Sequence, residues 1–168
     1  MLKHMAWANE EIFTKVSQLP DEALDSFVVN PEWTVREIAR HIASSATWYG
    51  WRLLDKSTFT EEESADWQRK LDLTEIQLAT ARDLLTSIEY VKAADAVLLA
   101  ASLLPEGDVE REWNGQIIIR KRSTIISQAI HHATEHRAQA VAALELRGFN
   151  SIVLDEYDLW NYADTIGE

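Results

Sequence analysis

The sequence predicts an all-α fold: a four-helix bundle with a long crossover connection and a small β-hairpin near residues 109–120. Four segments carry apolar residues at helical spacing, a pattern typical of amphipathic helices. Only five glycines and three prolines interrupt the 168 residues, and so few helix breakers favour long helices over many short strands. Asn114-Gly115, between two extended-looking runs, is the strongest short signal for a hairpin turn.

The first helix is expected over residues 3–18. Apolar residues from Met5 to Val16 recur there at helical spacing, which gives the segment one apolar face. Pro20 ends the helix, because proline lacks the backbone N–H that a helix interior needs. The length of the chain favours one domain over residues 1–168.

The second helix has a clear start signal. Thr34 and Glu37 stand at the N-cap and N3 positions of a capping box, and Trp33 stands where a hydrophobic staple would begin. The apolar stripe of this helix continues to about Leu54. His41 falls in the middle of the stripe, so we expect it to face the interior of the bundle.

The next segments predict a connection and a third helix. Residues 56–70 are polar and leave room for a short helical turn. Thr74 and Gln77 have the spacing of a second capping box, so the third helix is expected to begin there and to run to Leu99. Pro105 and the glycine two residues later end whatever remains of it.

The last predicted elements are the hairpin and a fourth helix. Two extended runs within Val109–Arg120 flank the Asn-Gly turn, and this hairpin must pack against helices, because an isolated two-stranded sheet is only marginally stable in water. Ser123 or Thr124 is expected to cap the fourth helix. That helix continues to Arg147, and Gly148 suits the position just after a helix end.

Three of the five histidines fall in one short stretch, HHATEHRAQA. On a helix that turns ~100° per residue, His132 and His136 lie ~40° apart on one face, whereas His131 points about 100° away from His132. A bundle brings facing helices together, so His41 on the second helix is the candidate for a third member of this group. The spacing therefore predicts a cluster of His41, His132 and His136.

Three neutral imidazoles would bind a divalent ion such as zinc, nickel or iron. Structural zinc sites usually have four protein ligands, so three ligands leave a position for water or substrate. Two ordinary interpretations stay open. A buried histidine is usually a hydrogen-bonded core residue, and an H-x-x-x-H pair also occurs on helices by chance.

The segment from His132 to His136 also fits H-x-x-E-H, the motif of inverted zinc proteases, in which the glutamate is the general base. Those proteases need a further carboxylate ligand and a larger α/β fold, whereas the surroundings here are helical. Glu135 remains a weak candidate for a catalytic base. The alternative is a solvated carboxylate on the outer face of the helix.

Trp48 and Arg137 are weak candidates for binding a substrate or cofactor. Aromatic residues could line a pocket over the ion, although at helical spacing they are more often core residues: Trp7, Trp48, Tyr49, Trp51 and Trp113. Arg137, beside the last histidine, could receive an anionic substrate or pair with one of the many carboxylates.

Composition limits the chemistry and the partners. The chain has no cysteine, so a thiol can enter the chemistry only on a substrate or cofactor. The net charge of −12 argues against nucleic acid and anionic membranes, both of which bind basic surfaces. The N-terminus is too polar for a signal peptide and no apolar run is long enough to span a membrane, so a cytoplasmic protein is expected. The expected partner is a small-molecule substrate.

Four segments, in order and over nearly the whole chain, resemble the DinB/YfiT-like family of metalloenzymes: MAWANEEIF, WTVREIARHIASSATWYGWRLL, HHATEHRAQAVAALELRG and DLWNYAD. The resemblance implies a four-helix bundle of unusual connection order, often a homodimer, in which three histidines hold a divalent metal. The matching positions are His41, His132 and His136. Ala138 departs from the pattern, since members commonly have glycine after His-Arg, and this affects packing more than chemistry.

Characterised members of this family are metal-dependent thiol transferases, which join bacillithiol, mycothiol or a similar small thiol to an electrophile, and a related isomerase depends on mycothiol. The resemblance therefore implies a low-molecular-weight thiol as co-substrate. Two other hypotheses stay open: a metal-dependent hydrolase that activates water, and a non-catalytic metal-binding or interaction bundle. The family name refers to induction by DNA damage and implies no DNA binding.

Overall fold

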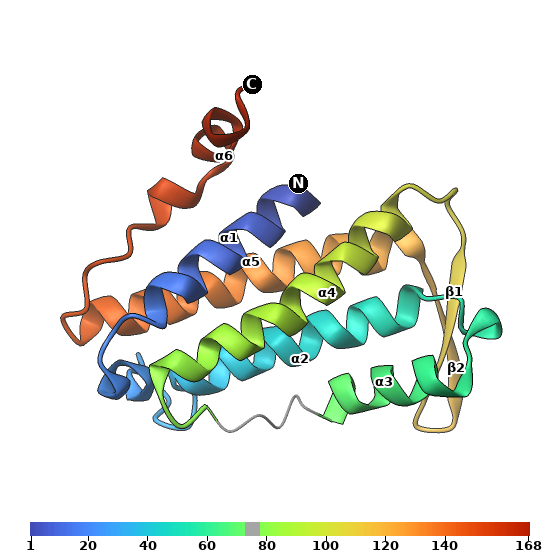
Figure 1. Ribbon diagram of the computed structural model, residues 1–168, viewed down its shortest axis with the longest axis horizontal. Coiled ribbons are helices and arrows are strands. Elements are labelled where there is room, and N and C mark those ends of the chain that lie inside the picture. The colour runs from blue at the N-terminus through green and yellow to red at the C-terminus, as the bar shows by residue number, and fades with distance from the viewer. Residues whose placement is uncertain (73–77) are drawn as a thin grey trace.

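The computed structural model describes residues 1–72 and 78–168 and shows a bundle of four long helices (Figure 1). These are α1 (Leu2–Val16), α2 (Val35–Leu53), α4 (Leu84–Ser102) and α5 (Arg122–Leu146). Helices α1 and α2 each pack against both α4 and α5, so α1 and α2 occupy diagonal positions. In Figure 1, α2 runs parallel to α4 and α1 runs parallel to α5. The predicted mostly helical fold is confirmed.

A long crossover joins the parallel helices α2 and α4. It contains a 3₁₀ turn, η2 (Lys56–Thr58), and α3 (Glu61–Asp72), which packs against α2 (Figure 1). The expectation of a polar connection with only a short turn is therefore wrong in extent, because α3 has 12 residues. The ring centroid of Trp67 in α3 lies 6.2 Å from that of Trp51 in α2, and Gly50, which has no side chain, leaves room for the Trp67 ring. A tertiary contact therefore supports this polar helix.

Helix α4 begins later than the sequence predicts. The predicted cap at Thr74 lies outside the described residues, and residues 78–80 are not helical. The chain enters the helix through a 3₁₀ turn, η4 (Ala81–Asp83), where the Asp83 carboxylate accepts a hydrogen bond from the backbone N–H of Thr80 at 2.7 Å. A carboxylate at this position satisfies an N–H group that the helix itself leaves without a partner.

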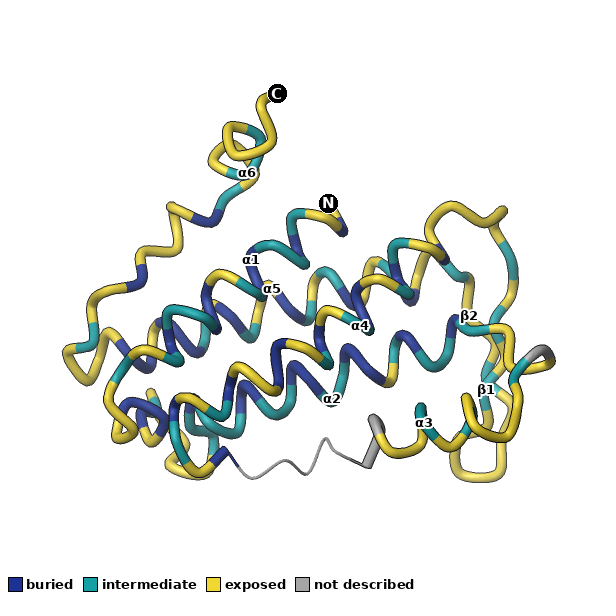
Figure 2. Tube along the Cα trace, in the orientation of Figure 1, coloured by how far each residue is buried: buried dark blue, intermediate teal, exposed yellow. Residues whose placement is uncertain are grey.

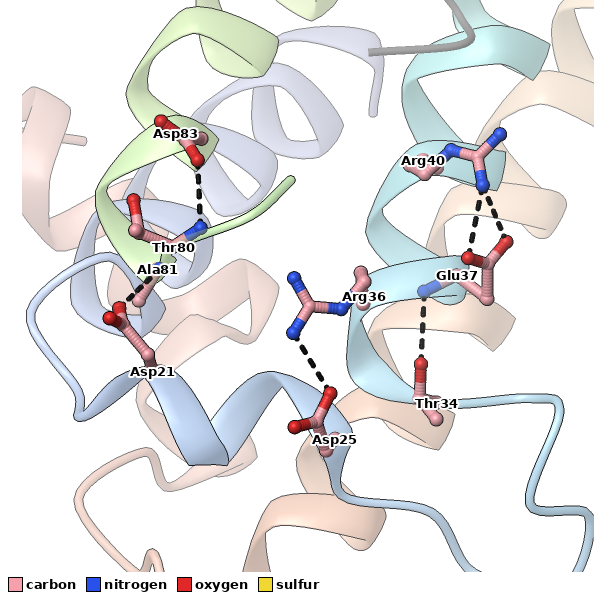
Figure 3. A network of polar contacts seen from close by, with 9 residues as sticks. All are labelled: Asp21, Asp25, Thr34, Arg36, Glu37, Arg40, Thr80, Ala81 and Asp83. Atoms are coloured by element: carbon pink, nitrogen blue, oxygen red, sulfur yellow. Dashed lines mark hydrogen bonds and ion pairs between the residues drawn. The ribbon is translucent and has the colours of Figure 1, made fainter. Parts of the chain in front are cut away.

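Polar contacts fix the helix starts at the end of the bundle where α2 and α4 begin (Figure 3). Thr34 Oγ1 accepts a hydrogen bond from the backbone N–H of Glu37 at 3.3 Å, so the predicted cap of α2 is confirmed. Asp21, in the 3₁₀ turn η1 (Asp21–Asp25), accepts one from the backbone N–H of Ala81 at 2.8 Å. This contact ties the loop after α1 to the start of α4.

The hairpin lies across the other end of the bundle, where α2 ends (Figure 1). Strands β1 (Asp108–Trp113) and β2 (Gln116–Lys121) are antiparallel. Asn114 and Gly115 both have positive φ, 52° and 74°, as a two-residue type I′ turn requires. The predicted hairpin is confirmed, and contacts of β1 with α2 and of β2 with α5 support it.

Helix α5 starts directly after the hairpin. It begins at Arg122, with Lys121 as N-cap residue, so the predicted caps at Ser123 and Thr124 are wrong. The strand leads straight into the helix, which leaves no loop for a separate capping residue. At the other end Gly148 has φ +88°, and the predicted glycine after the helix is confirmed.

Buried residues line the facing sides of the four long helices, while the outer sides are exposed (Figure 2). The chain ends in η5 (Leu154–Tyr157) and α6 (Leu159–Ile166), and α6 contacts α1 through Tyr162, whose ring centroid lies 5.4 Å from that of Trp7. None of the described residues of α6 is buried. Within the described ranges, no helix has both the length and the apolar character needed to cross a lipid bilayer.

Candidate metal centre

Three histidines from two helices meet inside the bundle. His41 comes from α2, and His132 and His136 come from α5; all three are half-buried, and one ring nitrogen of each lies within 4.8 Å of the others. The ring centroids of His41 lie 4.7 Å from those of both His132 and His136, which are themselves 4.3 Å apart. The structure therefore brings together the three residues that helical spacing selects.

The donor set fits a divalent ion. Zinc binds imidazole nitrogen at about 2.0–2.1 Å, so two nitrogens of a tetrahedral site lie about 3.3 Å apart. The Nε2 atoms of His41 and His132 are 2.9 Å apart, and all three donor nitrogens lie within 4.8 Å. These separations bracket the spacing that a tetrahedral site requires. Among the described residues no carboxylate belongs to the group, so the ligands are all imidazoles.

A glutamine and a tryptophan orient His136. The indole Nε1–H of Trp33 can only donate, so the Gln139 atom that it contacts at 3.0 Å is the amide oxygen. The same Oε1 accepts a hydrogen bond from His136 Nδ1 at 2.8 Å. His136 therefore carries its proton on Nδ1 and keeps a lone pair on Nε2, the nitrogen available to a metal.

Trp33 also covers the cluster. Its ring centroid lies 5.3 Å from that of His41 and 5.6 Å from that of His136, edge-on in both contacts. The sequence predicts a helix start at Trp33 and gives no direct sign of a role for Gln139. The position of Gln139, three residues after His136, is a signal for a supporting hydrogen bond on the same helix face.

Burial keeps the imidazoles in the form that binds metals. It is the largest cause that lowers the pKa of His41, and the neighbouring His136 adds to the effect. Burial, followed by the proximity of His136 and His41, lowers the pKa of His132 to about 4. Both rings are therefore neutral at pH 7, and a metal ion would displace few protons from them.

The three weaker candidates lie in different surroundings. The Glu135 carboxylate is 54% exposed and lies 3.6 Å from Nδ1 of His131, on the outer face of α5 and away from the cluster. The guanidinium of Arg137 is buried, at 4% exposure, and donates to Asn9 Oδ1 at 2.6 Å and to Thr134 Oγ1 at 3.2 Å. It is thus part of the core.

Trp48, the third of these candidates, is 44% exposed and lines a cavity of about 650 Å³ between the C-terminal half of α2 and strand β1. Tyr49 and Trp51 line the same cavity, as does Trp113. Tyr49 also packs edge-on against His132, with the centroids 5.8 Å apart, so the cavity adjoins the histidine cluster. Trp7 packs instead against Tyr157 and is a partly buried residue at the edge of the core.

Comparisons with known proteins identify the family of the chain but no individual relative. No curated protein and no solved structure gives a significant match. The resemblance of the quoted segments is nevertheless confirmed over almost the full length, and the three-histidine cluster agrees with it. The model of the DinB family matches residues 1–165, and the chain therefore belongs to the DinB family.

Proposed function

We propose that the protein is a metal-dependent transferase that joins a small cofactor thiol to an electrophile. The observation that carries this proposal is the convergence of three imidazoles, with no fourth protein ligand among the described residues. Zinc, nickel or iron suits such a donor set. A divalent ion there would supply Lewis acidity, which lowers the pKa of a thiol or of water at the open position.

The residues of the chain contribute position and environment. Gln139 and Trp33 hold His136 in one tautomer, and burial keeps His41 and His132 neutral. The adjoining cavity, with Tyr49 at its boundary with His132, would hold the electrophile or the rest of the thiol. Since the chain has no cysteine, no thiolate of its own competes for the ion.

Hydrolysis is a less favoured reaction for this geometry. A hydrolase usually needs a base positioned to take a proton from water. Glu135 lies on the outer face of α5, and no described carboxylate joins the cluster. A thiol, in contrast, loses its proton more readily than water does, so its transfer depends less on a protein base.

We further propose that the protein acts in the cytoplasm, where small thiols are kept reduced, and that it forms a homodimer, as the family resemblance implies. Mass measurement in solution by light scattering tests the second point. A mass close to the 19.2 kDa of one chain at micromolar concentration would contradict the dimer.

Metal content and turnover test the proposed function in two steps. Protein purified without a histidine tag should contain about one divalent ion per chain by elemental analysis. His132→Ala should lose the ion, while His131→Ala, which removes the neighbouring exposed imidazole, should keep it. Equal metal content in the two variants would contradict the site.

The second step separates the possible reactions. The metal-loaded protein is given bacillithiol, mycothiol or cysteine together with chlorodinitrobenzene, and in parallel a set of esters and amides. Thiol consumption that stops on chelation supports the transferase, whereas ester or amide cleavage alone would replace it by a hydrolase. A metal whose removal unfolds the helices, with no turnover of either set, would favour a non-catalytic bundle.

A further inference from the structure

Positive side chains gather at one cavity of a strongly acidic chain. The protein has 16 lysines and arginines against 28 aspartates and glutamates. Yet the cavity of about 650 Å³ beside the histidine cluster is bordered by Arg52 and Lys56 from the end of α2 and the turn after it, and by Arg111 from β1. Arg52 and Arg111 also border an adjacent cavity of about 240 Å³, together with Arg120.

The two arginines common to both cavities have no acidic partner in the described part of the chain. Neither Arg52 nor Arg111 forms an ion pair there, whereas Arg36, Arg40 and Lys121 each pair with a carboxylate at 2.7–2.9 Å. The Nε of Arg111 is buried and has no hydrogen-bond partner. A buried donor without a partner costs free energy.

Arg52 and Arg111 are also close enough to affect each other. Burial, and next the positive charge of Arg111, lower the pKa of Arg52. Glu110 and Glu112 border the larger cavity too, but they alternate with Arg111 along β1, so their side chains extend from the opposite face of the strand. The site thus holds two like charges that form no ion pair with a described side chain, although Glu110 and Glu112 also border the cavity.

Aromatic rings hold the guanidinium groups in place. Arg111 lies over the ring of Trp113, with 4.5 Å between its central carbon and the ring centroid, and Arg52 lies 5.9 Å from the centroid of Tyr49. A guanidinium stacked on a ring keeps its in-plane N–H groups available for a carboxylate or phosphate, which match its fork in geometry. The arrangement is that of a prepared anion site.

This site lies within reach of the histidine cluster. Ser45 and Tyr49, which border the larger cavity, lie one and two helical turns after His41 on the same side of α2. Tyr49 contacts both Arg52 and the ring of His132. The cavity therefore ends at Tyr49, next to His132, although none of the three histidines lines it.

We propose that Arg52 and Arg111 bind the carboxylate or phosphate group of an aromatic or otherwise apolar small molecule in this cavity. That the other end of this molecule reacts at the three-histidine cluster rests on the proposed function; anion binding itself does not. The rings of Trp48, Trp51 and Trp113 cover the apolar part.

Isothermal titration with matched probes tests the anion site. Benzoate and phenyl phosphate should bind the wild-type protein, and the relative affinity of the two tells a carboxylate site from a phosphate site. Benzyl alcohol, of similar shape and without charge, should bind at least roughly tenfold more weakly, because it forms no charge-assisted hydrogen bond. Equal binding of the neutral probe would overturn the proposal, and this comparison needs no variant.

Variants then assign the site. Arg111→Gln and Arg52→Gln should each weaken binding of the preferred anion by roughly tenfold or more. Arg82→Gln is the matched control, because it removes one positive charge from an exposed position at the opposite end of α4 from the hairpin. An equal loss in Arg82→Gln would show a general charge effect and overturn the assignment. Arg111→Lys, which keeps the charge but loses the fork, should recover only part of the affinity.

Metal content measured on the same samples keeps the two proposals apart. Anion binding by protein that holds no metal would support the proposed anion site and refute the metal-dependent function. A bound metal without selective anion binding would refute the proposed anion site and leave the proposed metal centre in place. Circular dichroism melting of each variant distinguishes lost contacts from lost folding.

Discussion

Replacing Gln139 with leucine should weaken metal binding while all three histidines stay in place. The Gln139 oxygen accepts hydrogen bonds from His136 Nδ1 at 2.8 Å and from Trp33 Nε1 at 3.0 Å. Leucine has a similar size and accepts neither. His136 would then be free to rotate or to place its proton on Nε2, the nitrogen that a metal needs.

The size of the effect follows from these two contacts. Loss of a hydrogen-bond partner of a metal-ligating histidine typically costs 10–100-fold in metal affinity, which is about 1.4–2.7 kcal/mol of binding free energy. Two hydrogen bonds lost from the folded, metal-free protein should lower its free energy of unfolding by about 1–3 kcal/mol. Both changes are measurable, and they refer to different states of the protein.

Competition with a fluorescent zinc indicator measures the affinity, and urea denaturation of the metal-free protein measures the stability. Gln139→Glu is the matched control: its carboxylate can accept both hydrogen bonds and makes the imidazole more basic, so metal affinity should be retained or increased. If Gln139→Leu binds zinc as tightly as the wild type, then Gln139 does not orient a metal ligand. The tautomer argument for His136 would fall with it.

Three further changes test other parts of the structure. Metal-free protein should lose stability as the pH falls from 6.5 toward 4, because unfolded His132 takes up a proton there and the folded ring, with its pKa of about 4, does not; pH-dependent thermal melting measures this. The melting temperature of Asp95→Asn, relative to that of the wild type, should rise as the pH increases from 5 to 8. Burial raises the pKa of folded Asp95 to about 7, so the wild type loses stability over this range as the buried carboxyl ionises, whereas asparagine does not ionise. An equal difference in melting temperature at pH 5 and pH 8 would contradict this. Gly115→Val should destabilise the fold by about 1–2 kcal/mol, because φ +74° is strained for any side chain with a Cβ branch; Gln116→Thr in β2 is the control.

Local signals account for the parts of the fold that the sequence predicts. The cap at Thr34, the turn at Asn114-Gly115 and the glycine after α5 each depend on residues within one turn of each other. The same holds for His132 and His136, whose relation is set by helical geometry alone. His41 could be added because a buried stripe fixes the face of α2 on which it lies.

Contacts between distant segments account for what the sequence does not predict. Helix α3 depends on the packing of Trp67 against α2, and its own residues are mostly polar. Arg137 could not be assigned, because its partners Asn9 and, through Asn9, Asp95 come from α1 and α4. The hydrogen bond between Trp33 and Gln139 spans 106 residues, so neither side chain alone indicates a role at the site.

The charges around the cluster bear on which substrate it favours. Three neutral imidazoles leave the full +2 charge on a divalent ion, whereas a carboxylate ligand would cancel part of it. Arg52 and Arg111 add positive charge at the adjoining cavity. With a divalent ion bound, the ion and the two arginines would make the local field positive, although the whole chain carries −12. Such a field favours a ligand that carries negative charge at both ends, a thiolate at the cluster and a carboxylate or phosphate at the arginines, over a neutral ester or amide.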